Sequence, residues 1–294
     1  MTRRELLAAT AAAASAAAQS RYAPKLAAQV YVWTQHFNQR KIPLADGIEE
    51  IFATTRKAGY TRLELVSQFV RPDLFDRTAR LLKKHRLELP IVYNGGPFHD
   101  PSLAGKTMDD MLEAARAARK LGAAYLNTNP NPKPGRARKT DQELETQAAL
   151  VNKLGAAVRQ EGLRLILHHH DPEMKEDARE LRHLVNNTDP KLAGFCIDLD
   201  WVIRGGHQFA PILELVGTRA ESFHLRNARG GVWTESLADG EYDFASVRRH
   251  LEKIGFQGYL TVELAVEKAT RVTRSLEENL RLSREYAVKV FGAK

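Results

Sequence analysis

Short runs of apolar residues alternate with longer amphipathic stretches along most of this chain. Each run has the length of a buried strand and is bounded by polar or turn-forming residues. The pattern predicts eight strands, at residues 30–33, 62–66, 89–93, 124–127, 164–168, 194–198, 221–225 and 259–264.

Between these runs, apolar residues recur at spacings of three and four, which predicts amphipathic helices. The helical patterns lie around residues 48–52, 74–82, 108–121, 144–158, 181–185, 211–216, 247–254 and 276–290. Gly59, Gly122, Gly162 and Gly255 each stand just before a predicted strand, where a left-handed glycine would end the preceding helix.

Strict alternation of strands and helices indicates a parallel sheet. Eight such units in one chain favour a closed (β/α)8 barrel, the TIM barrel. An open parallel sheet is the alternative, but no glycine-rich phosphate loop follows the first predicted strand.

Composition is that of an ordinary globular protein, with 43% hydrophobic and 27% charged residues. The single cysteine, Cys196, cannot form an internal disulfide. The net charge of +8 is spread along the chain, and the densest basic stretch, residues 133–139, is expected to be a solvated loop. We therefore expect no nucleic-acid partner.

The first 18 residues predict an export signal. Arg3 and Arg4 precede an Ala-rich run that ends in an A-x-A-like cleavage site at residues 16–18. The run is shorter than the roughly 20 apolar residues of a membrane span, and the paired arginines resemble a twin-arginine signal. We expect cleavage, a periplasmic location without membrane attachment, and one catalytic domain over residues 24–291. A frayed helix with two surface arginines is the alternative.

Charged or imidazole side chains stand near the ends of the last four predicted strands, namely His168, Asp198, His224 and Glu263. Neighbouring strand ends meet at one mouth of a barrel. Taken singly, each residue could be a core hydrogen-bonding group or a helix cap. A shared cation explains all four, because isolated charges inside a barrel are costly. We expect one divalent metal ion, with Mn²⁺ as first choice and Zn²⁺, Co²⁺, Fe²⁺ or Mg²⁺ as alternatives.

Several motifs resemble one family over residues 28–290. They are LEL at 63–65, HHHDPE at 168–173, CIDLDW at 196–201, FHLRN at 223–227, GEYDF at 240–244 and VE at 262–263. In this order they resemble the xylose isomerase-like TIM barrels known as sugar phosphate isomerases/epimerases. The resemblance implies a carbohydrate substrate and a metal held by Glu, Asp, His and Glu, which fall on His168, Asp198, His224 and Glu263.

The chain departs from the family pattern at three places. His168 stands where many members have Glu, Trp201 where many have His, and Arg226-Asn227 where Lys-Asp is common. The His-x-His-Asp motif at 168–171 and the Asp-x-x-Trp motif at 198–201 are shared with a subgroup often linked to keto-sugars or cyclitols.

The resemblance implies an isomerase or epimerase that abstracts a proton next to the carbonyl of a sugar or keto-sugar. Glu263 is the expected base, and His168, His170 or Glu173 would act from the opposite side. Because only one Glu of the family's facing pair remains, a metal-dependent lyase or dehydratase of a 3-keto-glycoside or keto-inositol is the alternative. The side chains expected to contact the substrate are Glu64, His99, Trp201 and Arg226.

Two other classes are less favoured. Apurinic endonucleases share this barrel but need further His and Asp ligands for three zinc ions, and Trp201 occupies one such position. A non-catalytic sugar-binding barrel would bind its ligand without a metal. A small-molecule carbohydrate is thus the expected partner, and a homo-oligomer stays open.

Overall fold

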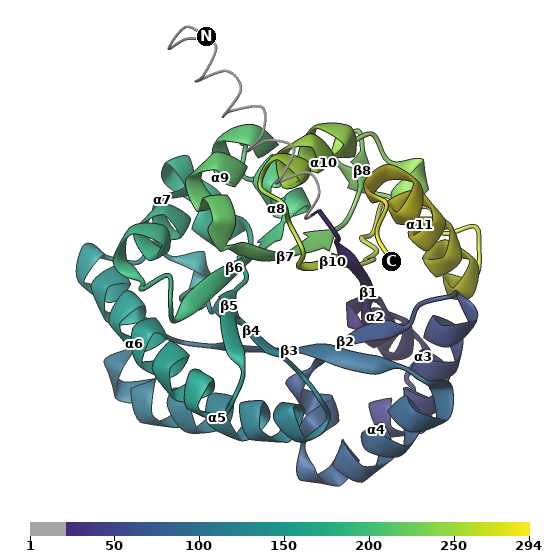
Figure 1. Cartoon of the computed structure of the whole chain (residues 1–294), viewed down its shortest axis with the longest axis horizontal. Helices are drawn as coiled ribbons and strands as arrows, with labels where there is room; N and C mark the ends of the chain where they lie inside the picture. Colours follow the sequence, from purple (N-terminus) through teal and green to yellow (C-terminus); the bar gives the residue numbers. More distant parts are fainter. Residues whose placement is uncertain (1–21) are drawn as a thin grey trace, which may run out of the picture.

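The computed structural model describes residues 22–294 as a closed barrel of parallel strands (Figure 1). The order around the ring is β1-β10-β7-β6-β5-β4-β3-β2, and pairing of β1 with both β10 and β2 closes it. The predicted (β/α)8 fold is therefore confirmed, whereas the predicted export signal at residues 1–18 lies outside the described residues. The barrel strands are β1 (Lys25–Gln29), β2 (Arg62–Val66), β3 (Glu88–Gly96), β4 (Tyr125–Pro130), β5 (Arg164–Leu167), β6 (Ala193–Asp198), β7 (Ala220–Leu225) and β10 (Tyr259–Val262).

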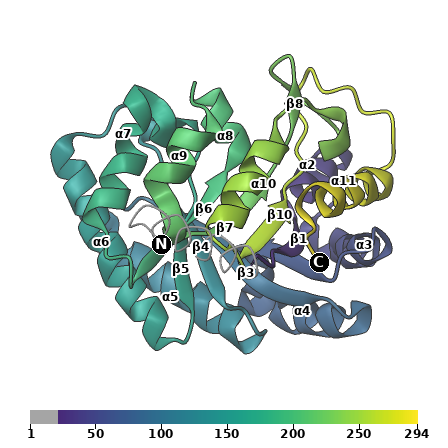
Figure 2. The same cartoon turned by 45° about the horizontal axis from the view of Figure 1, so that its top comes forward.

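Helices form the outer layer, as the tilted view in Figure 2 shows. A small antiparallel hairpin, β8 (Ala228–Arg229) and β9 (Val232–Trp233), stands apart from the barrel sheet. Within residues 22–294, no helix combines the length and apolar character needed to cross a bilayer. The helices are α2 (Tyr31–Arg40), α3 (Leu44–Lys57), α4 (Pro72–His85), α5 (Ala104–Lys120), α6 (Asp141–Gln160), α7 (Asp171–Asn187), α8 (Leu199–Arg204), α9 (Phe209–Val216), α10 (Phe244–Lys253) and α11 (Leu276–Phe291).

The first predicted strand is wrong. Residues 30–33 belong mostly to α2, and the strand lies just before them in β1. Val30, Val32 and Trp33 are nearly fully buried, so their apolar run reflects the buried face of a helix start rather than a strand. His36 also lies on α2, where its ring is 3.7 Å from the Glu50 carboxylate.

Side chains that point into the barrel form stacked layers. The lower layer is apolar and consists of Ala27, Ile91, Ile166, Cys196 and Tyr259, with Tyr125 packed against it. Because side chains alternate along a strand, a residue two positions further on faces the same interior. Polar residues occupy these upper positions: His168 follows Ile166, Asp198 follows Cys196, and Asn127 follows Tyr125.

The two ends of the described chain meet beside β1, at the N-terminal end of the barrel (Figure 1). The Leu26 N–H donates to an oxygen of Lys294 at 2.8 Å, and the Lys294 N–H donates to the Pro24 carbonyl at 3.2 Å. The Tyr22 hydroxyl donates to the Phe291 carbonyl at 2.8 Å. The last residues of the chain thus close the face opposite the ends of the strands that carry the polar layer.

In the basic stretch at residues 133–139, residues 134–138 are exposed, as expected of a solvated loop, but Lys139 at its end is buried. The Lys139 ammonium is buried and donates to Gln147 Oε1 and Glu180 Oε2, both at 2.9 Å. Its neighbours make ion pairs nearer the surface, Lys133 with Glu143, Arg136 with Asp171 and Arg138 with Glu176. The stretch therefore ties the β4–α6 connection to the start of α7.

Candidate metal centre

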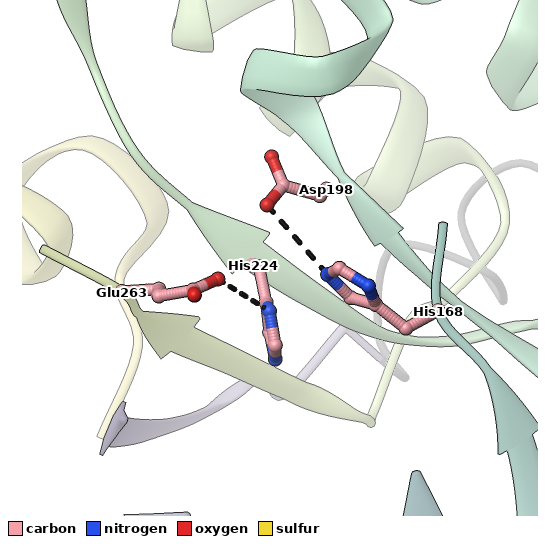
Figure 3. Close-up of side chains that lie close together, drawn as sticks. All are labelled: His168, Asp198, His224 and Glu263. Carbon is pink, nitrogen blue, oxygen red and sulfur yellow. Dashed lines mark ion pairs between the residues drawn. The ribbon is translucent and has the colours of Figure 1, made fainter. Parts of the chain in front are cut away.

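Four buried side chains converge at the mouth of the barrel. His168 follows β5, Asp198 ends β6, His224 lies in β7 and Glu263 follows β10 (Figure 3). One possible ligand atom from each lies within 4.8 Å of those of the others. These are the residues in which the sequence predicted a metal site, and the structure brings them together.

Strand pairing explains why these side chains meet. Asp198 and His224 are direct register partners on β6 and β7, and His224 is in turn the partner of Thr261 on β10. Two residues beyond Thr261, Glu263 faces the same interior by the alternation of the strand. The site is therefore built by neighbouring strands and does not depend on a flexible loop.

The donor atoms are buried and short of partners. Among the described residues, both ring nitrogens of His168, Asp198 Oδ2, His224 Nδ1 and Glu263 Oε2 lack a hydrogen bond. His168 Nε2 lies 3.6 Å from Asp198 Oδ2, and His224 Nδ1 lies 2.7 Å from Glu263 Oε2 without hydrogen-bond geometry. An unsatisfied buried polar group costs about 1–3 kcal/mol, so a shared cation fits this set of donors.

The protonation states also suit a metal. Burial lowers the pKa of His168 well below its ordinary value, which leaves a neutral imidazole. Burial alone would raise the pKa of Glu263, but the Arg226 guanidinium and the His224 imidazole hold it well below the usual range. A neutral imidazole and an ionised carboxylate are the forms that bind metals.

The local fold orients Asp198. Its carboxylate caps α8, because Oδ1 accepts from the Asp200 N–H at 2.9 Å and the Trp201 N–H at 3.2 Å. The other oxygen, Oδ2, is left free on the side of His168. A helix N-cap thus aims one carboxylate oxygen at the proposed ion.

Glu64 lies beneath this group instead of lining the mouth. It is fully buried in β2, and both carboxylate oxygens lie 3.1 Å from His224 Nε2. The Asn127 amide donates to Glu64 Oε1 at 3.1 Å. Its predicted substrate contact is therefore not supported by its position.

Arg226 lies beside the carboxylates of two candidate ligands, Glu263 and Asp198. Its Nη2 atom lies 3.0 Å from Glu263 Oε1 and 3.9 Å from Asp198 Oδ2, and its Nε atom donates to the Glu263 carbonyl at 3.2 Å. The guanidinium also lies over the Trp233 ring, 4.3 Å from its centroid. Arg226 thus connects the candidate ligands to the aromatic side of the mouth.

His170 and Glu173 occupy the start of α7. The His170 N–H donates to Glu173 Oε2 at 2.9 Å, and His170 Nδ1 lies 2.9 Å from Asn129 Oδ1. If this Nδ1 donates to the amide oxygen, Nε2 is free to accept a proton. Burial lowers the pKa of His170 to about 3 and raises the pKa of the fully buried Glu173 to about 7.

Aromatic rings gather on one side of the mouth. The Trp201 ring is 5.7 Å from His170 and 5.9 Å from Trp233, and Tyr93 contacts His168 at 5.7 Å. Trp233 and Tyr93 were not predicted. Tyr93 ends a predicted strand and could have been considered, whereas Trp233 lies in the β8–β9 hairpin, which no periodic pattern marks.

Two other histidines are not among the candidate ligands. His99, expected to bind substrate, lies near Lys139 and Glu143, whose charges act on its ring, and burial lowers its pKa. His169 is buried, and its Nε2 accepts from the Asp198 N–H at 3.2 Å. His169 therefore holds the end of β6 from behind.

Known proteins resemble this chain in sequence and in fold. Residues 52–286 match the family described as xylose isomerase-like TIM barrel. An inosose dehydratase of Clostridium perfringens is 26% identical over 148 residues, which cover 44% of this chain and 50% of that protein. The chain thus matches half of the length of this relative.

Solved structures extend the similarity to nearly the whole barrel. A sugar phosphate isomerase/epimerase of Parabacteroides distasonis superimposes with a TM-score of 0.70 at 18% identity, covering 90% of this chain and 93% of that one. A 3-keto-D-glucoside 4-epimerase of Escherichia coli gives a TM-score of 0.70 at 14% identity, covering 90% of this chain and 99% of that one. At these identities the similarity establishes the fold.

Proposed function

Because the chain belongs to the xylose isomerase-like TIM barrel family, we propose that it is a metal-dependent carbohydrate enzyme that removes a proton next to a carbonyl. The expected substrate class is a keto-sugar or keto-cyclitol. One observation carries the proposal: His168, Asp198, His224 and Glu263 present unsatisfied donors to one point at the barrel mouth.

Two imidazoles and two carboxylates suit Mn²⁺, Zn²⁺, Fe²⁺ or Co²⁺, and Mn²⁺ is our first choice. When bound, such an ion would polarise the substrate carbonyl and stabilise the negative charge that develops on its oxygen.

The chain's own acids differ in access to a substrate. Glu263 is 7% exposed and ionised, whereas Asp198, Glu64 and Glu173 are 0% exposed. Glu263 is therefore the carboxylate best placed to take the proton. Arg226, which contacts Glu263, would hold a substrate oxygen, and Trp201 would cover one face of the sugar ring.

His170 is the best group to act opposite Glu263. It is partly exposed, it contacts Trp201, and its neutral ring leaves Nε2 free. The Glu173 carboxyl group accepts a hydrogen bond from the His170 backbone N–H. We therefore assign Glu173 to stabilising the start of α7 and not to transferring the proton.

The donor set favours elimination over epimerisation as the second step. Epimerisation through two equivalent carboxylates requires one on each face of the substrate, and His168 replaces the second one. Elimination requires one base and a proton for the leaving group. Glu263 can take the proton from carbon and, once protonated, return it to the leaving oxygen, so no second acid is required. The curated relative is likewise named a dehydratase. Epimerisation is the second candidate, with His170 as the second base, and one structural neighbour is named a keto-glucoside epimerase.

The test is to incubate Mn²⁺-loaded protein with 3-keto-glycosides, ketoses and inososes in D₂O and follow them by NMR. Loss of an alcohol or water supports the lyase, and deuterium incorporation without elimination supports the epimerase. Glu263→Gln should abolish both the elimination and the deuterium incorporation. If no compound changes, or if chelation of the metal leaves turnover intact, the proposed function is wrong.

Export by the twin-arginine route stays a prediction. Replacing Arg3 and Arg4 by Lys should hold the full-length chain in the cytoplasm of the expressing cell, because this route requires the arginine pair. Periplasmic recovery of the double variant at the level of the parent chain would refute the prediction.

A further inference from the structure

We propose that Glu64 is a positioning residue that fixes His224 as a metal ligand through Nδ1. The inference rests on the metal site of the proposed function and adds a role for a side chain in a distant strand. In the ring of strands, β2 and β7 are separated by β1 and β10. The Glu64 carboxylate therefore reaches His224 across the interior of the barrel.

The geometry determines which nitrogen faces the ion. His224 Nε2 lies 3.1 Å from each Glu64 oxygen, and an ionised carboxylate can only accept hydrogen bonds. When Nδ1 binds the ion, the remaining ring proton lies on Nε2 and is donated to Glu64. Nδ1 lies on the side of the metal cluster, 2.7 Å from Glu263 Oε2. A carboxylate that holds a histidine in this way fixes its tautomer and its ring orientation.

A third strand holds Glu64 in place. The Asn127 amide, from β4, donates to Glu64 Oε1 at 3.1 Å, and both side chains are 0% exposed. His224 covers the carboxylate on the side of the candidate ligands, so a substrate at the mouth would meet His224 first. The position of Glu64 thus fits a support for the ligand and leaves no direct path to the substrate.

The experiment compares metal affinity in Glu64→Gln and in a matched control, Glu221→Gln. Glu221 lies on the same strand as His224, but its carboxylate pairs with Arg164 at 2.6 Å and takes no part in the site. Zn²⁺ and Mn²⁺ affinities are measured by competition with a chromophoric chelator. We expect Glu64→Gln to bind each metal roughly 10–100-fold more weakly, and the control to stay within about twofold of the parent chain.

Loss of the Glu64 charge alone would also weaken cation binding, so a second readout is required. Histidine ¹⁵N NMR of the Zn²⁺-loaded chain should show His224 bound through Nδ1 with its proton on Nε2, and Glu64→Gln should give a mixture. Asn127→Ala, which leaves Glu64 in place, should weaken binding by roughly threefold, as for the loss of one hydrogen bond. This variant also provides a test if Glu64→Gln does not fold.

The outcomes separate the two proposals. If the parent chain binds no divalent metal, both the proposed function and this inference are wrong. If the parent chain binds metal and folded Glu64→Gln binds it equally well, only the role of Glu64 is refuted. Coordination of the metal by His224 Nε2 in the parent chain would also refute it.

Discussion

Glu173 is a carboxyl group in the wrong environment for a charge. It is fully buried, and burial raises its pKa to about 7. Such a group stays protonated in the folded chain over a pH range in which the unfolded chain has already ionised it. Its contribution to stability is therefore complete below about pH 4.5, decreases as pH rises through the window to about 7, and is lost above it.

We expect Glu173→Gln to remove this pH dependence, because an amide accepts the His170 N–H without titrating. Relative to the parent chain, the free energy of unfolding of the variant should rise by on the order of 3 kcal/mol between pH 4.5 and pH 8. Urea unfolding of both proteins at each pH, in the presence of a chelator, measures this difference in the free energy of unfolding. A difference between the two proteins that is the same at both pH values would contradict the assignment.

Asp198 combines a helix cap with a candidate metal ligand, and one substitution separates the two roles. Asp198→Asn keeps the capping oxygen but replaces the free Oδ2 with an amide nitrogen, which cannot bind a cation. Because Asn and Asp cap helices about equally well, we expect little change in the free energy of unfolding of the metal-free chain. The affinity for Mn²⁺ or Zn²⁺, measured by isothermal titration calorimetry, should fall by at least about 100-fold.

Asp243 offers a control for this change. It caps α10, where its Oδ1 atom accepts from the Ser246 N–H, and it is not one of the candidate ligands. Asp243→Asn should leave metal affinity unchanged. Equal affinities in the two variants would show that Asp198 is not a ligand.

At the scale of single residues, sequence reasoning located the four candidate ligands because each lies near the end of an apolar run. It assigned Glu64 to the substrate, which the buried position of this side chain does not support. Period-two alternation shows that Glu64 faces the interior, but the His224 ring that it meets comes from a strand far along the chain. The depth of a side chain within the barrel depends on the stagger of the strands, which a single sequence does not provide.

At the scale of elements, glycines marked the helix ends correctly. Gly59, Gly122, Gly162 and Gly255 all have positive φ, between +64° and +94°. At the start of α6, Thr140 forms a capping box with Glu143. The first strand was missed because a short apolar run fits a buried helix start as well as a strand.

Two glycines at either end of α5 offer a matched pair of substitutions. Gly122 follows the helix with φ +94°, whereas Gly105 lies inside the helix, and a Cβ at either would meet no atom within 4 Å. We expect Gly122→Ala to lower the free energy of unfolding by about 1–2 kcal/mol through backbone strain. Gly105→Ala should raise it by up to about 1 kcal/mol.

Denaturant unfolding of the two variants and of the parent chain measures the change in the free energy of unfolding that each substitution causes. If both substitutions destabilise to the same extent, then local packing, which the structure does not show at either site, controls the response instead of φ.

At the scale of the whole molecule, alternation along the chain was sufficient to predict a closed barrel. The connections were less predictable. The β8–β9 hairpin brings Trp233 next to Arg226 and Trp201, and the Trp233 indole N–H donates to Asp200 at 2.7 Å. Such contacts join segments that have no common periodicity, so they appear only once the strands and helices are placed in space.

The packing at the closed end of the barrel should contribute much of the stability. Phe291 is 0% exposed and packs against Phe244, whereas Val288 on the same helix is 37% exposed. We expect Phe291→Ala to lower the free energy of unfolding by about 3–5 kcal/mol, and Val288→Ala to change it by less than about 0.5 kcal/mol. Thermal unfolding followed by circular dichroism compares them, and similar melting temperatures would refute this account.

The meeting of the two ends of the described residues 22–294 beside β1 also bears on how this part of the protein can be handled. With the Lys294 N–H 3.2 Å from the Pro24 carbonyl, a linker of a few residues could join these ends, and new termini could be opened in a surface connection. A tether attached there would orient the molecule on a support with its catalytic mouth facing the solution.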